Sequence, residues 1–244
     1  MRPILVTLLL LGCLAATLAW FRLGHVAARD HKGGTDDMTG ERAEMVRVLT
    51  AYGITDPRIL ATMGKVRRHR FIPESFRGSA DPYGDHPCPI GHGQTISQPY
   101  IVAYMTGRIN PQPGEKILEI GTGSGYQAAV LADLGADVYS VEIIPALADH
   151  ARAVLAAEGF RVNVLAGDGY QGWPEHAPYD AVIVTCAPEQ LPRALVDQLK
   201  DGGRMILPLG ESGFQRLVVL RKSGTAFTQE EDLPVRFVPM VPGE

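Results

Sequence analysis

The segment 116–127, KILEIGTGSGYQ, constrains the fold of this chain more strongly than any other stretch. An apolar run from Ile117 to Ile120 enters a turn with glycine at positions 121, 123 and 125. A helical pattern of apolar residues then begins at Ala128. Glycines in a strand-to-helix turn let the main chain approach a ligand closely. The segment therefore predicts a nucleotide-type cradle, although it does not indicate which chemistry the cradle serves.

The chain from residue 111 onward alternates between strand-like and helix-like segments. The expected strands are 116–120, 137–142, 161–165, 180–185 and 204–209. The expected helices are 124–134, 145–157 and 191–199. This alternation is typical of an α/β fold with a mostly parallel central sheet and helices on both faces. Ligands of such sheets bind beyond the carboxyl ends of the strands.

Two further β-like runs, 217–220 and 233–238, follow the last of these strands. The first begins too soon after strand 204–209 to leave room for a crossover helix. A strand pair joined by so short a connection must be antiparallel. We therefore expect antiparallel strands at the C-terminal edge of the sheet.

The part of the chain before residue 111 has a different character. Helical spacing begins near Thr39, and Asp56-Pro57 supplies a cap and a first-turn proline for a second short helix. Residues 71–89 are rich in Pro, Gly and Asp and predict a structured loop. We divide the chain into an apolar segment with its linker (1–38), a helical and loop cover (39–110) and the sheet domain (111–244).

Composition and charge argue against several classes of function. The chain has 45% apolar and 20% charged residues and a net charge of −4, so it offers no electrostatic case for nucleic-acid binding. The three cysteines, Cys13, Cys88 and Cys186, lack the spacing of a zinc site or a disulfide framework. We expect no metal.

The N-terminal residues 4–21 are almost wholly apolar and lie between Arg2 and Arg22. They are compatible with a signal peptide, with an uncleaved membrane anchor, or with a protein that starts at Met38 instead. Positive charge after the stretch exceeds that before it, which for an anchor places the main domain in the cytoplasm. We expect a cytoplasmic protein whose membrane contact, if there is any, is limited to residues 4–21.

Acidic residues stand at two further strand ends. Glu142 ends strand 137–142, where its carboxylate can accept hydrogen bonds from ribose hydroxyls. Asp168 and Gly169 follow strand 161–165, where the Asp168 carboxylate can accept from an adenine amino group. A glycine turn with two acidic strand ends predicts a site for an adenosine-containing ligand.

The spacing of the glycines distinguishes between two such ligands. The dinucleotide fingerprint requires a third small residue at the position where this chain has the bulky Tyr126. A shorter cradle suits a ligand with an amino-acid tail, which main-chain groups of Gly121, Thr122 and Gly123 can meet. The sequence therefore favours S-adenosyl-L-methionine over a nicotinamide dinucleotide.

Three blocks of sequence carry a resemblance to a known family. They are GQTISQPYIVAYM at 93–105, ILEIGTGSGYQAAVLA at 117–132 and YDAVIVTCAPEQLPRALVDQLKDGGRMILPLG at 179–210, and the tail VRFVPM at 235–240 is similar to that family's ending. On these residues the chain resembles protein-L-isoaspartate O-methyltransferases from about Thr39 to its end. The first block is the most specific, because glycine-rich cradles occur in many methyltransferases.

The resemblance implies a Rossmann-like class I methyltransferase fold with S-adenosyl-L-methionine as methyl donor. The implied acceptors are L-isoaspartyl residues of damaged proteins and peptides, whose methyl ester collapses to a succinimide and so initiates repair. It implies that residues 39–110 contain the acceptor site, and we expect a monomer.

The resemblance also assigns individual residues. Ser97 matches the family's active-site serine, with Thr95, Ile96 and Gln98 around it in the acceptor site. The expected donor-binding residues are Gly121, Thr122, Gly123, Ser124, Gly125, Glu142, Ile143, Asp168 and Gly169.

The chemistry of methyl transfer to a carboxylate agrees with these residues. A carboxylate is ionised at neutral pH, so the reaction needs alignment and exclusion of water, but no general base. The hydroxyl of Ser97 can orient the acceptor carboxylate. Two alternatives remain open: a class I methyltransferase for another acceptor, and a non-catalytic adaptor that binds S-adenosylmethionine.

Overall fold

The computed structural model describes residues 38–78, 81–211 and 213–243. The chain divides into two units, Met1–Met38 and Thr39–Glu244, and the helices and strands described below belong to the second. The expectations for residues 4–21 fall outside the described residues. Within the described ranges, no helix combines the length and the apolar character needed to cross a membrane.

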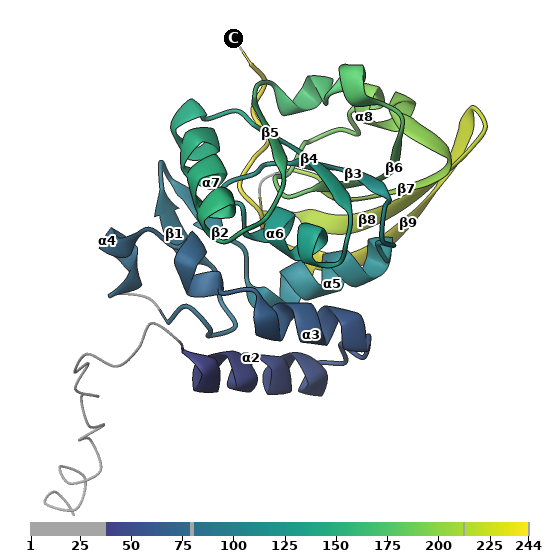
Figure 1. Ribbon diagram of the computed structural model, residues 1–244. Coiled ribbons are helices and arrows are strands. Elements are labelled where there is room, and N and C mark those ends of the chain that lie inside the picture. The colour runs from purple at the N-terminus through teal and green to yellow at the C-terminus, as the bar shows by residue number, and fades with distance from the viewer. Residues whose placement is uncertain (1–37, 79–80, 212, 244) are drawn as a thin grey trace, which may run out of the picture. The chain divides into compact units, whose positions relative to one another are not determined.

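Among the described residues, seven strands form one sheet in the order β5-β4-β3-β6-β7-β8-β9 (Figure 1). The parallel strands are β5 (Asn163–Ala166), β4 (Asp137–Glu142), β3 (Lys116–Ile120), β6 (Tyr179–Val184) and β7 (Leu199–Leu209). The antiparallel strands are β8 (Gln215–Ser223) and β9 (Ala226–Val235). The predicted α/β fold with a mostly parallel sheet and antiparallel C-terminal strands is confirmed.

Helices cover both faces of this sheet, as Figure 1 shows. One face carries α5 (Pro99–Ile109), α6 (Tyr126–Asp133) and α7 (Pro145–Ala157), and the opposite face carries α8 (Arg193–Asp197). Because side chains alternate along a strand, Leu118 and Ile120 of β3 join the core beneath α8, and Glu119 points to the α6 side. This alternation places a carboxylate inside the protein, next to the glycine turn.

The cover before the sheet contains short helices and one hairpin. The helices are α2 (Thr39–Ala51), α3 (Pro57–Lys65) and α4 (Glu74–Arg77), with a 3-10 turn η1 (Arg68–Phe71). The predicted cap of α3 is present, since the Asp56 carboxylate accepts from Arg58 N at 2.8 Å. The boundary that the sequence suggests at residue 110 falls in the turn between α5 and β3. The assignment of acceptor binding to residues 39–110 stays a prediction.

The structure differs from expectation in the segment before Ser97. Strands β1 (Cys88–Gly91) and β2 (Gln94–Ile96) form an antiparallel hairpin where the sequence suggested only loop. Its turn uses positive φ angles at Gly91, His92 and Gly93 (93°, 52° and 70°). Short strands without regular alternation of apolar residues carry no periodic signal, so sequence patterning does not reveal them.

The end of the chain also differs. Strand β9 begins at Ala226, earlier than the run expected at 233–238. The sequence did not predict its first half, because this edge strand carries the polar and charged residues TQEED and has no apolar run there. The segment after β9 pairs instead with the loop that follows the central strand β6: Ala187 N donates to Val238 O and Met240 N donates to Ala187 O, both at 2.8 Å. These bonds bring the tail beside the carboxyl ends of the parallel strands.

Short 3-10 turns complete the loops at the ends of the strands. η2 (Gly169–Gln171) follows β5, and η3 (Pro174–His176) precedes β6. Helix α8 is shorter than the segment expected at 191–199, because β7 already begins at Leu199.

Candidate active site

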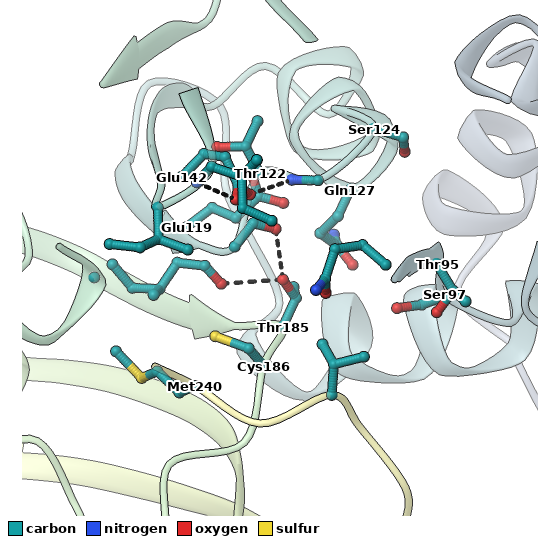
Figure 2. Close-up of a pocket in the computed structure, with 18 of the residues that line it drawn as sticks. Thr95, Ser97, Glu119, Thr122, Ser124, Gln127, Glu142, Thr185, Cys186 and Met240 are labelled. Atoms are coloured by element: carbon teal, nitrogen blue, oxygen red, sulfur yellow. Dashed lines mark hydrogen bonds between the residues drawn. The ribbon is translucent and has the colours of Figure 1, made fainter. Parts of the chain in front are cut away.

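A pocket opens at the carboxyl ends of the parallel strands, where the loops after β3, β4, β5 and β6 meet (Figure 2). The turn after β3 contributes the glycine cradle, β4 ends in Glu142, and Thr185 follows β6. Carboxyl ends of parallel strands share one edge of a sheet, so segments distant in sequence meet there. The tail closes the pocket from another side with Val238, Met240 and their neighbours.

Glu142 connects the glycine turn to the end of β4. Its carboxylate accepts from Gly123 N at 2.8 Å through Oε2 and from Ile144 N at 2.9 Å through Oε1, and the residue is only 5% exposed. Each carboxylate oxygen has two lone-pair sites, so both can accept a further bond from a ligand hydroxyl. Glu142 thus shapes the cradle and also presents acceptors to whatever occupies it.

A second carboxylate of the pocket, Glu119, is fully buried. Its Oε2 accepts from Ser140 Oγ at 2.5 Å, and Ser140 in turn lies 2.5 Å from Thr122 Oγ1. Burial raises the pKa of Glu119 to about 8, the Ser140 bond lowers it, and the charge of Glu142 raises it again. The sequence reasoning missed Glu119, although an acidic residue within the apolar run KILEI was a signal for it.

The charged residue types in the described pocket lining are all acidic, and the raised pKa of Glu119 keeps that group largely protonated at neutral pH before a ligand binds. Glu119 and Glu142 line the pocket, and within the described lining there is no Lys, Arg or His. Opposite charge stabilises an ionised group, whereas two like charges in a buried site destabilise one another. The pocket therefore suits a cationic ligand and disfavours an anionic one such as a pyrophosphate.

Gly121 occupies a position that only glycine fits. Its φ is +94°, and a Cβ built there would lie 2.6 Å from Thr185 Oγ1. Thr185 Oγ1 lies 2.7 Å from Gly121 O and 3.0 Å from Ile120 O, and it can donate to either carbonyl. The end of β6 is thereby fastened to the cradle, in agreement with the close backbone approach that the glycine turn indicates.

Tyr126, the first residue of α6, shows why a dinucleotide fingerprint is missing. The residue is 1% exposed, and its ring packs edge-on against Phe71 of η1 at a centroid distance of 5.6 Å. The side chain thus fills space between the glycine turn and the N-terminal cover. Tyr126 therefore packs the helix after the glycine turn against the N-terminal cover.

A second groove adjoins the pocket. It is lined by Pro87, Thr95, Ser97, Gln98, Ile101, Thr185 and residues 234–239. The residues that line both the pocket and this groove are Thr95, Ser97, Thr185, Val238 and Pro239. Figure 2 shows Thr185 between Ser97 on one side and the Glu119 and Glu142 side of the pocket on the other. The Ser97 side chain therefore stands at the junction of two cavities.

The residues expected from the sequence fall into three groups. Those that line the pocket are Thr95, Ile96, Ser97, Gly121, Thr122, Gly123, Ser124, Glu142, Ile143 and Gly169. Gln98 lines only the second groove. Gly125 and Asp168 line neither: a Cβ on Gly125 would lie 3.2 Å from Leu155, and Asp168 Oδ1 accepts from Tyr170 N at 2.8 Å. The ligand contacts assigned to all of these residues stay predictions.

Comparison with known proteins identifies the family. The profile described as protein-L-isoaspartate(D-aspartate) O-methyltransferase matches residues 40–244. The chain belongs to this family. A protein-L-isoaspartate O-methyltransferase of Synechococcus sp. (strain JA-2-3B'a(2-13)) is 53% identical over 216 residues, which cover 85% of this chain and 88% of that protein. The one of Gloeobacter violaceus is 54% identical over 194 residues, with 79% of this chain and 94% of that protein covered.

Solved structures of protein-L-isoaspartate O-methyltransferases share the fold. One superposes with a TM-score of 0.74 at 29% identity and covers 81% of this chain, which spans 65% of that chain. A second, described as a putative enzyme from Plasmodium falciparum in complex with S-adenosyl-L-homocysteine, has a TM-score of 0.72 at 26% identity. The matched region covers 82% of this chain and 98% of the Plasmodium falciparum chain.

Proposed function

We propose that this protein is a protein-L-isoaspartate O-methyltransferase, which transfers the methyl group of S-adenosyl-L-methionine to the free carboxylate of L-isoaspartyl residues in damaged proteins. Membership of the family over residues 40–244 supports the reaction. The observation that carries the proposal is the pair of cavities that meet at Ser97, one lined by Glu119 and Glu142, the other a groove. A donor and a polypeptide can then enter from separate sides.

The charge of the pocket fits the donor. S-adenosyl-L-methionine carries a sulfonium and an ammonium against one carboxylate, so its net charge is positive. Glu119 and Glu142 line the pocket without a basic residue among the described lining. Glu142 would accept hydrogen bonds from the ribose hydroxyls, as its position at the end of β4 indicates. Methyl transfer removes the sulfonium charge, so the product is attracted less strongly than the donor.

The groove fits an extended acceptor. Its lining is mostly apolar or neutral, and the tail 234–239 forms one wall. When bound, the donor supplies a methyl group on a positive sulfur, and its transfer to a carboxylate converts two opposite charges into two neutral groups. Because charge disappears in this step, a site that excludes water accelerates it. The role of the chain is to align the carboxylate and to keep solvent out.

The surroundings of the Ser97 side chain support a role in orienting the acceptor. Within the described part of the chain, its hydroxyl makes no hydrogen bond to another residue, and the side chain is only half-buried. It is thus available to donate to the acceptor carboxylate. A serine with a neutral hydroxyl suits this purpose, since a charged partner would lower the nucleophilicity of the carboxylate.

The reaction is tested by transfer of labelled methyl from S-adenosyl-L-methionine to an isoaspartyl peptide and to its aspartyl twin. We expect base-labile label on the isoaspartyl peptide alone. Equal labelling of both peptides would indicate a methyltransferase for another acceptor. Donor binding without label on either peptide would favour the non-catalytic adaptor.

Replacing Ser97 tests whether its hydroxyl binds the acceptor. Ser97→Ala should lower kcat with the isoaspartyl peptide by about ten- to a hundredfold, the value of one hydrogen bond to a charged group. Donor affinity, measured by calorimetry, should stay within about twofold. The exposed Ser223→Ala at the end of β8 provides a matched control. A large loss of donor affinity in Ser97→Ala would reassign the serine to the donor.

The protein's location and assembly are part of the proposal. We propose a cytoplasmic monomer, and the cytosolic origin of S-adenosyl-L-methionine supports the location. Proteins and peptides with isoaspartyl residues are the proposed partners.

A further inference from the structure

Arg68, in η1, is a buried cation that has no anionic partner among the described residues. The residue is 0% exposed, and among the described residues its guanidinium has no carboxylate within ion-pair distance. Its neighbours Arg67 and Arg70 both pair with Glu158, so the unpaired cation is specific to this position. An apolar residue of similar size often stabilises a protein as well as a buried charge does. The cation at this site therefore calls for an explanation beyond packing.

The Arg68 guanidinium donates to three main-chain carbonyls, and its Nη2 also lies 4.0 Å from Cys88 Sγ. Nε donates to Pro82 O at 2.7 Å, Nη1 to Ser97 O at 2.8 Å, and Nη2 to His86 O at 3.3 Å. Pro82 and His86 precede the hairpin of β1 and β2, and Ser97 follows it. One guanidinium thus fixes both ends of the hairpin segment. A planar fork with five donors can do this, whereas an ammonium on a flexible stem cannot.

The next residues along the chain are held by Asp85, which directly precedes His86. The carboxylate of Asp85 accepts from Gln98 Nε2 at 2.7 Å and from Tyr100 N at 2.9 Å. These bonds hold the start of α5. The carbonyl of Ser97, one residue earlier, depends on Arg68.

The guanidinium also contacts the donor side of the site. Its Cζ lies 5.2 Å from the ring centroid of Tyr126, and Tyr126 directly follows Gly125 of the glycine turn. Contact between a cation and a buried aromatic face is attractive. Arg68 thus connects the Ser97 main chain to the first residue of the helix that leaves the cradle.

We infer that Arg68 is a positioning residue, which sets the Ser97 hydroxyl at a fixed place relative to the donor cradle. The inference rests on the proposed function for the identity of the acceptor. The contacts of Arg68 with the Ser97 main chain and with Tyr126 do not depend on that function. Loss of the guanidinium frees the Ser97 carbonyl and the hairpin ends, while Glu142 and the glycine turn keep their own bonds. Acceptor turnover should therefore suffer, and donor binding should not.

The test uses the full chain and two substitutions, Arg68→Lys and Arg68→Ala. We expect kcat with an isoaspartyl peptide to fall about tenfold or more in both, as a misplaced catalytic group predicts. The dissociation constant for S-adenosyl-L-homocysteine should change by less than about threefold. Free guanidinium at a non-denaturing concentration should restore part of the rate in Arg68→Ala, but not in Arg68→Lys, whose ammonium occupies the site.

The control is Leu220→Ala in β8, a fully buried residue in the core beneath α8. This substitution should lower the melting temperature, yet leave kcat at temperatures below the transition within about twofold, because it leaves the site geometry intact. If Arg68→Ala does not fold, Arg68→Lys decides. Unchanged kcat in a folded Arg68→Lys, with the wild type active, would overturn the inference.

A second measurement does not depend on activity. Amide hydrogen exchange in the peptide that covers residues 93–98 should be faster in Arg68→Lys than in the wild type, and unchanged in Leu220→Ala. Unchanged exchange in Arg68→Lys would overturn the inference even if the wild type had no activity on isoaspartyl peptides. An inactive wild type would instead contradict the proposed function.

Discussion

Glu142→Gln should weaken the binding of S-adenosyl-L-methionine by about a hundredfold, equivalent to about 3 kcal/mol. The carboxylate accepts the amides of Gly123 and Ile144, one on each oxygen. A glutamine can satisfy only one of them, because its NH₂ group would face the other N–H, donor against donor. The variant should therefore lose the proposed ribose acceptor and also loosen the cradle. An unsatisfied buried donor costs about 1–3 kcal/mol, in addition to the lost ligand bond.

Titration calorimetry with S-adenosyl-L-methionine and with S-adenosyl-L-homocysteine measures this effect. At saturating donor, kcat should fall much less than the affinity, since Glu142 does not line the acceptor groove. Glu158→Gln provides the matched control, because Glu158 is a buried carboxylate that pairs with Arg67 and Arg70 outside the pocket. A donor affinity of folded Glu142→Gln within threefold of the control would contradict the assignment.

Glu119→Gln should stabilise the ligand-free protein at pH 8 by several kcal/mol relative to the wild type, and by much less at pH 5. Burial raises the pKa of Glu119 from its ordinary 4.5 to about 8. Between these two values the folded state holds a proton that the unfolded state has lost. Stability then falls as pH rises, by no more than about 5 kcal/mol for this group. The variant has no ionisable group at this position, so it lacks this decrease.

Urea unfolding at pH 5, 6.5 and 8 tests the prediction. The difference in unfolding free energy between Glu119→Gln and the wild type cancels the contributions of other titrating groups, and we expect it to increase with pH. A difference that is independent of pH would show that Glu119 is already ionised in the folded protein. The positive donor should also favour the ionised carboxylate, so binding at pH 7 should release protons from the wild type and fewer from the variant.

Local patterns in the sequence predicted the centre of the fold. The apolar run into the glycine turn and the helical spacing after it define β3 and α6, and the same reasoning located β4, with Glu142 at its end. Parallel strands buried on both faces have continuous apolar runs, so a short window of sequence suffices to find them. The bulky Tyr126 already argued against a dinucleotide, and the block around Ser97 indicated the family.

The sequence did not predict elements that depend on distant partners. The hairpin of β1 and β2 has no periodic signal, and β9 is an edge strand whose charged residues hide it. The burial of Glu119 depends on α6 and Ser140, which lie on other segments. Asp168, chosen because of its position after a strand, caps η2 in the structure and does not line the pocket.

The sequence by itself determined the fold class and the donor cradle, because these follow from contacts within one strand–turn–helix unit and from its regular repetition. Only the tertiary structure decided how the acceptor side is completed. Ser97 lines the same two cavities as Val238 and Pro239, which lie far away in the sequence, and Arg68 donates to the Ser97 carbonyl from a separate turn. Such contacts come from packing of distant segments, which no local pattern encodes.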